Sequence, residues 1–238
     1  MAEPWYVEAF RAEYLDVYAH RDLESARSDA DYLVRHGVAG RTLDLCCGSG
    51  RHCLALRERG VEAFGLDFSP DLLVRAHGLE GRLVRADARA IPFAEGRLDS
   101  VVSLFSSFGY FGEDGDRRVL SEAARVLRRD GVLVLDLMNP PRVRGELVPR
   151  SRTVRDGVEI EERRQLADGG RRVVKDVRWR PRDGSDRTWR EDVRLYEPDE
   201  IGGLLARSGL ERTGVHGDFD SAPFSAGSPR QIVLARKR

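Results

Sequence analysis

Short apolar runs alternate with amphipathic segments through residues 41–138, and this alternation constrains the fold more than any other feature. The apolar runs predict five strands, near residues 41–47, 61–67, 81–87, 98–105 and 131–138. The intervening stretches predict helices at residues 50–60, 69–78 and 116–131. Ser69 and Pro70 suit the N-cap and first position of the second of these helices. Strands that alternate with helices make right-handed crossovers, so we expect an α/β fold with a doubly wound, mainly parallel sheet.

The segments on either side of this alternation have a different character. Four aromatic residues spaced four apart predict one helix over residues 4–20, namely Tyr6, Phe10, Tyr14 and Tyr18. From residue 142 to 197 polar and apolar residues alternate, and glycine turns near residues 157, 169 and 184 signal hairpins. We expect three or four antiparallel strands there, then a helix and a C-terminal antiparallel pair at the sheet edge. The Pro140-Pro141 step predicts a rigid turn.

The predicted organisation therefore has three parts. Residues 1–141 supply N-terminal helices and the ligand-binding core, residues 142–197 form an inserted antiparallel region, and residues 198–238 complete the core sheet. The insert is expected to act as a lid over a substrate pocket, or alternatively as a homodimer contact.

Composition excludes several classes of function. The 238 residues include 40 basic and 40 acidic side chains, so no net field attracts nucleic acid or an acidic membrane. The first residues lack the basic and apolar regions of a secretory signal, and no apolar run reaches the roughly 18 residues of a membrane span. The three cysteines lie within residues 46–53, which favours a reducing, cytoplasmic location over a disulfide framework.

The candidate site follows from the strand ends, because ligands of open α/β sheets bind beyond the carboxyl ends of the strands. Cys46 and Cys47 lack a second pair of ligands at metal-binding spacing, so no metal is expected. No Gly-Lys-Ser/Thr step is present, which excludes a nucleoside-triphosphate loop. A dinucleotide fingerprint beginning at Gly48 is a poor match, because Cys53 stands where a small residue should pack and Asp44 disfavours a diphosphate.

The same acidic residues suit a cationic nucleoside ligand. Asp44 is placed to attract an amino group, and Asp67 to accept hydrogen bonds from the two hydroxyls of a ribose. Asp87 is placed to accept a hydrogen bond from an adenine amine. Three carboxylates on successive strand ends around a glycine turn predict a site for an adenosine that carries an amino acid.

These residues resemble the motifs of class I S-adenosylmethionine-dependent methyltransferases. The first motif reads Asp44-x-Cys46-x-Gly48-x-Gly50, the second "GLDFSP" and the third "RADARAIPF". "CCGSGRH" is similar to a bacterial subgroup of small methyltransferases with an inserted β region. Cys46 replaces the usual first glycine, which suggests that this position need not adopt a positive φ.

The resemblance implies a seven-stranded Rossmann-like sheet, S-adenosyl-L-methionine as methyl donor and S-adenosyl-L-homocysteine as product. It implies that the methionine amino group lies at Asp44, the ribose at Asp67, the adenine against Phe68, and the methionine portion beside Leu104 and Phe105. The cofactor-binding residues expected from it are Asp44, Leu45, Cys46, Cys47, Gly48, Gly50, Asp67, Phe68, Asp87, Ala88, Leu104 and Phe105.

The methyl acceptor is expected to be a small molecule that is methylated on nitrogen or oxygen. The alternatives are an RNA- or protein-directed methyltransferase and a non-catalytic binder of an adenosyl ligand or nucleotide. Candidate acceptor-binding residues are Tyr14, Phe108, Tyr110, Asn139 and Asp218. No catalytic base is evident, and the candidates for that role are His52, Tyr14 and His216.

Overall fold

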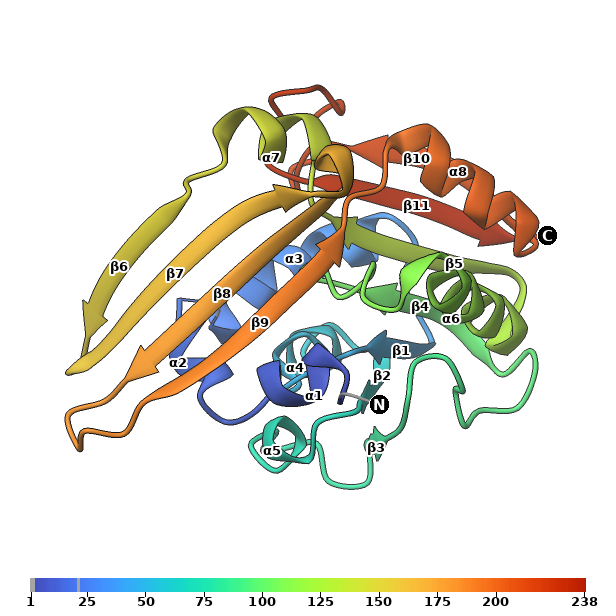
Figure 1. Cartoon of the computed structure of the whole chain (residues 1–238). Coiled ribbons are helices and arrows are strands. Elements are labelled where there is room, and N and C mark those ends of the chain that lie inside the picture. Colours follow the sequence, from blue (N-terminus) through green and yellow to red (C-terminus); the bar gives the residue numbers. More distant parts are fainter. Residues whose placement is uncertain (1–2, 21) are drawn as a thin grey trace.

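A computed structural model describes residues 3–20 and 22–238. Its main sheet has seven strands in the order β10-β11-β5-β4-β1-β2-β3 (Figure 1). Neighbouring strands run parallel except around β11, which is antiparallel to both β10 and β5. The bounds are β1 Arg41–Leu45, β2 Glu62–Asp67, β3 Leu83–Arg85, β4 Leu98–Ser103, β5 Leu127–Leu137, β10 Leu210–His216 and β11 Gln231–Lys237. The predicted doubly wound sheet and its C-terminal antiparallel pair are confirmed.

Helices cover both faces of this sheet. One face packs on α3 (Leu23–Arg35) and α4 (Arg51–Arg57), and the other on α6 (Gly112–Val126) and α8 (Pro198–Arg207). Successive residues of β5 are buried against opposite layers: Val132 and Val134 face the first pair of helices, while Leu133 and Leu135 face the second. Burial on both sides explains why the central strands read as unbroken apolar runs.

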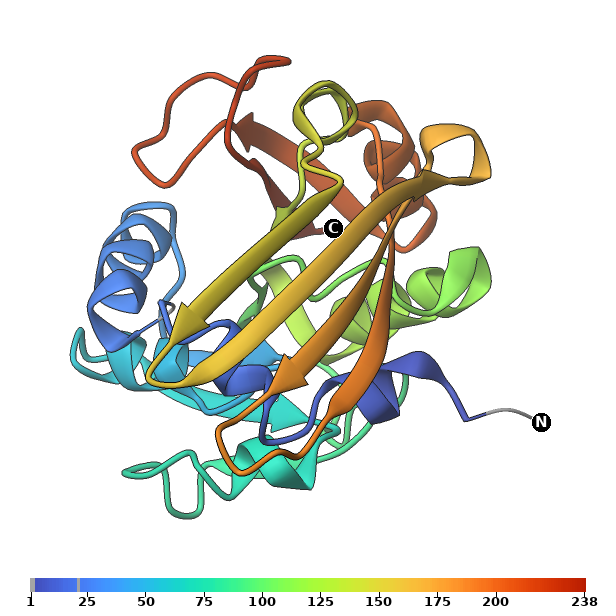
Figure 2. The same cartoon turned by 60° about the vertical axis from the view of Figure 1, so that its left-hand side comes forward.

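The inserted region forms a separate four-stranded antiparallel sheet in the order β6-β7-β8-β9. Its strands are β6 Arg150–Arg155, β7 Val158–Ala167, β8 Arg172–Arg180 and β9 Arg187–Arg194, with the 3-10 turn η1 Asp168–Gly170 between β7 and β8. The three loops of this meander fall at the predicted glycine turns. This sheet crosses in front of the carboxyl ends of the parallel strands, and the N-terminal helices lie between the two sheets (Figures 1 and 2).

The N-terminal segment is not the single helix expected from its aromatic spacing. It forms two short helices, α1 (Trp5–Ala9) and α2 (Tyr14–Val17). The first ends because the backbone leaves the helical region at Phe10, whose carbonyl accepts a hydrogen bond from the Ser69 hydroxyl. Ser69 is itself the N-cap of α5 (Pro70–Leu73), as predicted. The break folds the aromatic residues over the ends of β1 and β2.

Two further boundaries differ from the sequence expectation. The helix expected at residues 116–131 is α6, which begins earlier and ends at Val126, because Leu127 is fully buried and pairs with Leu98 at the start of β5. The Pro-Pro step does not form a simple turn: Pro140 begins the helix α7 (Pro140–Glu146), where a missing backbone N–H costs nothing. Among the described residues, no helix is long and apolar enough to cross a membrane.

Candidate functional site

Two cavities meet at the carboxyl ends of the parallel strands. The inner cavity lies against the ends of β1, β2 and β4, and the outer cavity lies between the inserted sheet, α7 and the N-terminal helices. The outer cavity has a volume of about 710 Å³. Both cavities share one wall, which is entirely aromatic and consists of Phe10, Tyr14, Tyr18, Phe105 and Tyr110. Ligands in the two cavities would therefore meet beside these rings.

The glycine turn between β1 and α4 forms the floor of the inner cavity. Gly50, with φ of 76°, caps α4, and a β-carbon there would collide with the buried side chain of Leu79. Gly48 has φ of 57°, and its N–H donates to Asp67 Oδ2 at 2.8 Å. Among the described atoms nothing lies closer than 3.9 Å to a β-carbon built at Gly48. The turn therefore leaves its backbone open to close approach by a ligand.

The expectation about Cys46 is wrong. This residue has φ of 59°, in the left-handed region that favours glycine. Its neighbours fix this conformation, because the Cys47 N–H donates to Leu66 O at 3.0 Å and the Gly50 N–H donates to Cys47 O at 2.9 Å. Cys46 is the single residue between the end of β1 at Leu45 and the hydrogen-bonded turn that begins at Cys47, so the change of chain direction falls on it. A non-glycine residue in this region costs on the order of 1–2 kcal/mol, which the surrounding hydrogen bonds offset.

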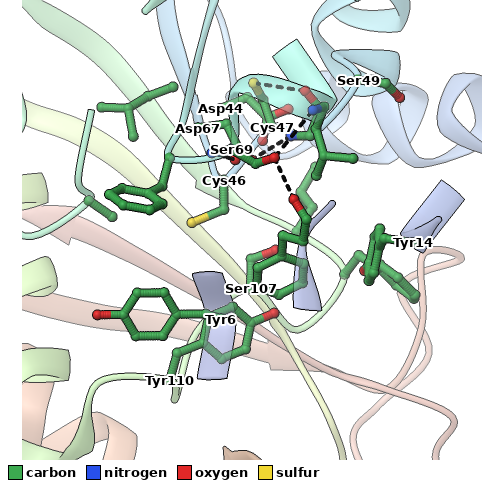
Figure 3. Close-up of a pocket in the computed structure, with 18 of the residues that line it drawn as sticks. Tyr6, Tyr14, Asp44, Cys46, Cys47, Ser49, Asp67, Ser69, Ser107 and Tyr110 are labelled. Carbon is green, nitrogen blue, oxygen red and sulfur yellow. Dashed lines mark hydrogen bonds between the residues drawn. The ribbon is translucent and has the colours of Figure 1, made fainter. Parts of the chain in front are cut away.

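Asp44 and Asp67 lie on the same side of the inner cavity, above Tyr6 and Tyr110 in Figure 3. Asp44 is 1% exposed, and burial raises the pKa of its carboxyl to about 7, with Asp67 adding to the rise and Arg51 opposing it. Cys53 Sγ donates to Asp44 Oδ2 at 3.7 Å. A carboxylate that is this reluctant to ionise gains most when a cationic ligand arrives.

Asp67 ends β2 and holds two loops together. One carboxylate oxygen accepts from Gly48 N–H and the other from Ser69 N–H, each at 2.8 Å. Burial raises the pKa of this carboxyl, and those backbone hydrogen bonds oppose the rise. An ionised carboxylate has about four acceptor positions, so each oxygen retains one for a ligand hydroxyl.

Asp87 lines the same cavity but is paired with Arg89, which the sequence did not suggest as a site residue. Arg89 contacts both carboxylate oxygens, the closest at 2.6 Å, and this pairing lowers the pKa of Asp87. The guanidinium also lies 4.5 Å from the ring centre of Phe111 and donates to the Tyr6 hydroxyl at 3.2 Å. Arg89, Tyr6 and Phe111 therefore close the end of the cavity at Asp87.

The shared wall depends on a strained turn after β4. Phe105 and Ser106 both have positive φ, 55° and 57°. Asp136 accepts from Phe105 N–H at 2.7 Å and from Arg230 Nε at 2.6 Å, and Arg230 also donates to Ser106 Oγ at 2.7 Å. This buried network holds the Phe105 ring between the two cavities. Neither Asp136 nor Arg230 carries a sequence signal, because they meet only when β11 pairs with β5.

The structure brings most of the expected cofactor-binding residues to the inner cavity. Its lining includes Asp44, Cys46, Cys47, Gly48, Asp67, Phe68, Asp87, Ala88, Leu104 and Phe105. Leu45 is buried in the core beneath the turn, and Gly50 supports the turn from behind without lining the cavity. Phe68 is 42% exposed and lies with its ring centre 6.3 Å from that of Tyr6.

The expected acceptor-binding and catalytic residues are scattered. Tyr14 and Tyr110 lie in the shared wall. Phe108 lines neither cavity, because the left-handed turn before it directs its ring into the core against Tyr196. Asn139 lines the outer cavity, but its amide nitrogen donates to the carbonyls of Ser225, Ala226 and Ser228.

The remaining candidates anchor loops and helices. His52 lines the inner cavity and bonds to Asp29 at 3.0 Å, and burial lowers its pKa. His216 lies outside both cavities and bonds to the Tyr32 hydroxyl at 2.7 Å. Asp218 also lies outside them and accepts from the backbone of its own loop.

Residues 42–131 match the model of a family described as a methyltransferase domain. The chain is 39% identical over 128 residues to a demethylmenaquinone methyltransferase of Thermus thermophilus, covering 50% of this chain and 56% of that protein. It is 36% identical over 115 residues to a glycine/sarcosine N-methyltransferase of Aphanothece halophytica, covering 45% and 43%. The chain thus spans about half the length of these curated relatives.

Solved structures show the same fold over nearly the whole chain. An S-adenosylmethionine-dependent methyltransferase from Clostridium acetobutylicum superposes with a TM-score of 0.79 at 19% identity, covering 94% of this chain and 96% of that one. The CcbJ methyltransferase from Streptomyces caelestis gives 0.77 at 21% identity, covering 90% and 95%. The similarity to these two structures therefore includes the inserted sheet as well as the parallel core.

Proposed function

We propose that this chain, which belongs to the class I S-adenosylmethionine-dependent methyltransferases, transfers a methyl group from S-adenosyl-L-methionine to a nitrogen or oxygen of a small molecule. One observation carries the proposal: three carboxylates and an open glycine turn line one cavity, and that cavity meets a second one across an aromatic wall. The donor is assigned to the inner cavity and the acceptor to the outer cavity.

The inner cavity fits such a donor better than it fits a dinucleotide. The buried Asp44 carboxyl next to the turn would repel a diphosphate and attract an ammonium group. The free acceptor positions of Asp67 suit the two ribose hydroxyls. At the far end, Arg89 donates to both oxygens of Asp87, so the Ala88 backbone beside this pair is the group proposed to contact an adenine edge.

Bound there, the donor supplies a sulfonium methyl group for in-line displacement. The chain's own contribution is then alignment and exclusion of water, and alignment alone is worth about 7–11 kcal/mol of barrier reduction. Phe105 and Tyr110 line both cavities and would flank the point at which the acceptor atom approaches the methyl group. Aromatic faces beside the sulfonium would contribute about 0.5–2 kcal/mol.

The inserted sheet covers the outer cavity and is proposed to act as the acceptor lid. Its inward-facing residues pack against Trp5 and the side chains of α7. In this arrangement the parallel core holds the donor, and the insert selects the acceptor.

Calorimetry tests the donor assignment directly. Titration of the full chain with S-adenosyl-L-homocysteine, with S-adenosyl-L-methionine and with NAD should give micromolar binding of the first two and no heat from the third. Tight binding of NAD, or a diphosphate lying across the turn after Asp44 in a co-crystal, would refute the proposed function.

A further inference from the structure

Charged side chains interrupt the apolar inner face of the inserted sheet. Arg164, Lys175 and Glu191 are paired in one row across β7, β8 and β9. Glu162 lies on the same face of β7, and all four side chains line the outer cavity. Apolar residues flank the row on the same face, with Val173 and Val193 on one side. We call Glu162, Arg164, Lys175 and Glu191 the charged row.

The members of the charged row are bonded to one another and largely buried. Lys175 Nζ lies 2.8 Å from Glu191 Oε2 and 3.5 Å from Glu162 Oε1, and Arg164 lies 2.5 Å from Glu162 Oε2. The side chains of Lys175, Glu162 and Glu191 are 11%, 16% and 12% exposed. Burial alone would raise the pKa of Glu162, but Lys175 and Arg164 bring it below its usual value. Glu162 is therefore held in its ionised form although it is largely buried.

Stability does not require these charges. Removing two ions from water costs several kcal/mol each, and apolar residues of similar volume are commonly as stable or more stable in such positions. The neighbouring positions on this face already carry valine, so the sheet can pack without ion pairs here. A charged row kept at that cost, in the wall of a cavity of about 710 Å³, indicates a ligand.

Glu191 connects the row to the aromatic wall. Its Oε2 accepts from the Tyr18 hydroxyl at 3.0 Å, and Tyr18 also accepts from Lys175. The Tyr18 ring centre lies 5.2 Å from that of Phe105. The negative charge of Glu191 also contributes to the raised pKa of Tyr110. Glu191 therefore lies beside the aromatic rings that border both cavities.

The carboxylates of the row have acceptor capacity left. Glu191 accepts from Tyr18, Lys175 and Trp189 Nε1, the last at 3.2 Å. Glu162 accepts from Ser151, Arg164 and Lys175. With about four acceptor positions on each carboxylate, one remains on each for a donor outside the protein.

From these observations, and resting on the proposed function, we infer that the methyl acceptor is a primary or secondary amine whose ammonium group is held by Glu191 and Glu162 at the aromatic wall. The size of the cavity indicates the rest of the acceptor molecule. A free amino acid would leave most of the 710 Å³ unfilled, so we expect the amine to be part of a larger, partly apolar molecule of drug-like size. Valine, leucine and methionine side chains at the α7 end of the cavity would contact that body.

The transfer is balanced without a further reactant. The bound ammonium first loses one proton to solvent, and the resulting nitrogen lone pair forms the new N–C bond. The S–C bond breaks as that bond forms, and sulfur keeps the bonding pair and becomes neutral. An oxygen acceptor would need a much stronger base than the carboxylates of the charged row.

A matched pair of probes tests the inference by binding alone. 4-Phenylbutylamine is an ammonium ion at neutral pH, and 4-phenylbutan-1-ol is its neutral counterpart. Titrated by NMR into the full chain saturated with S-adenosyl-L-homocysteine, the amine should bind about tenfold more tightly than the alcohol, the equivalent of one charge-assisted hydrogen bond. Glycine should bind more weakly than either probe.

Substitution of Glu191 should remove the preference. Glu191→Gln should bind the two probes equally, while Glu161→Gln, on the opposite face of β7 from Glu162, should keep the tenfold difference. The double variant Lys175→Met/Glu191→Met serves as a second test. It removes both partners of this ion pair, so neither charge is left buried without its counter-ion.

The outcomes separate this inference from the proposed function. Equal binding of the probes to the unmodified chain, or a preference that survives both Glu191 variants, would overturn the amine assignment even if the donor product binds normally. Failure of S-adenosyl-L-homocysteine to bind would instead refute the proposed function. The same probe titration on the ligand-free chain would then still decide whether the outer cavity selects ammonium groups.

Discussion

The inner and outer cavities share a wall but differ in the source of their polar groups. The inner cavity uses a backbone turn and single acidic residues at strand ends, and its buried Asp44 has a pKa raised to about 7. The outer cavity uses the side-chain face of an antiparallel sheet, where Glu191 and Lys175 are already paired. The first is prepared for a ligand that brings its own positive charge. The second already holds both signs of charge and offers its spare acceptor positions to a polar group of the ligand.

This difference indicates a division of labour. The turn at Gly48 lies within residues 42–131, which match the methyltransferase domain, so the proposed donor site lies in the matched part of the chain. The charged row lies outside the matched residues 42–131. Changes in the parallel core should therefore alter donor binding, and changes in the inserted sheet should alter acceptor choice. Four predictions test that separation.

The largest effect is expected where the two cavities join. Arg230→Met would leave the buried Asp136 carboxylate without its cation and release Ser106 Oγ. Loss of one partner of a buried ion pair should lower the free energy of unfolding by about 3 kcal/mol, measured by urea denaturation. Because Phe105 lines both cavities, binding of the donor product and of the amine probe should weaken together.

Two comparisons check the cause of that effect. Arg236→Met removes an exposed arginine of β11, which donates to Asp130 O, and should change stability by less than about 0.5 kcal/mol. Adding Asp136→Asn to Arg230→Met removes the orphaned charge and should restore part of the loss. A loss below about 1 kcal/mol for Arg230→Met would show that the network does not hold the wall.

The second prediction concerns the donor cavity alone. Asp67→Ala removes the acceptors of the Gly48 and Ser69 N–H groups as well as those proposed for the ribose. Affinity for S-adenosyl-L-homocysteine, measured by calorimetry, should fall at least about tenfold, or roughly 1.4 kcal/mol. The amine probe should bind as before, and Asp114→Ala, a fully exposed acidic residue, should change neither affinity. Unchanged donor binding would remove Asp67 from the site.

The residues that line the inner cavity could be predicted from the sequence because they follow strand ends, while their role in binding the donor stays a prediction. Asp44, Gly48 and Asp67 are local signals, and parallel strands place their carboxyl ends together whatever their order. The pairing of Asp87 with Arg89 was equally local but was not anticipated. The central positions of the strands at residues 98–105 and 131–138 were also predicted, because both read as buried on two faces, but the order of the seven strands was not predicted.

The acceptor cavity could not be predicted in the same way. Glu162, Lys175 and Glu191 lie on three strands, and only the cross-strand register places them together. In the sequence they are charged residues within alternating strands, a pattern typical of a solvated face. Phe108 is a second failure of sequence reasoning, because the left-handed turn at Phe105 and Ser106 directs the Phe108 ring into the core while Tyr110 lines both cavities.

The third prediction uses the pKa of Asp44. Burial raises this pKa to about 7, so between about pH 4 and 7 the folded chain binds more protons at this group than the unfolded chain, and its contribution to stability falls as pH rises. If the ionised carboxylate holds the ligand ammonium, donor affinity should rise about tenfold from pH 6 to pH 8. Calorimetry near pH 6.5 in buffers of different ionisation enthalpy should also detect proton release.

Asp44→Asn provides the control for that pH dependence. The variant should bind S-adenosyl-L-homocysteine weakly and with little change between pH 6 and 8, because the titrating carboxyl is gone. The buried His52 also faces the inner cavity, and any pH dependence that persists in Asp44→Asn would belong to it or to another group. Amine-probe binding in the outer cavity should not follow the Asp44 titration.

The smallest effect is expected at Cys46. Replacement by glycine relieves a left-handed backbone, which favours the folded state by about 1 kcal/mol, but it also frees the unfolded chain and removes a partly buried side chain. These contributions oppose one another, so Cys46→Gly should change the free energy of unfolding by less than about 1 kcal/mol and leave donor affinity within about threefold. Cys46→Val places a β-branched residue at the same positive φ and should cost more, about 1–3 kcal/mol. Equal stability of the two variants would show that the turn does not need a left-handed backbone at Cys46. Only Gly48 and Gly50 would then supply the positive φ angles on which the turn depends.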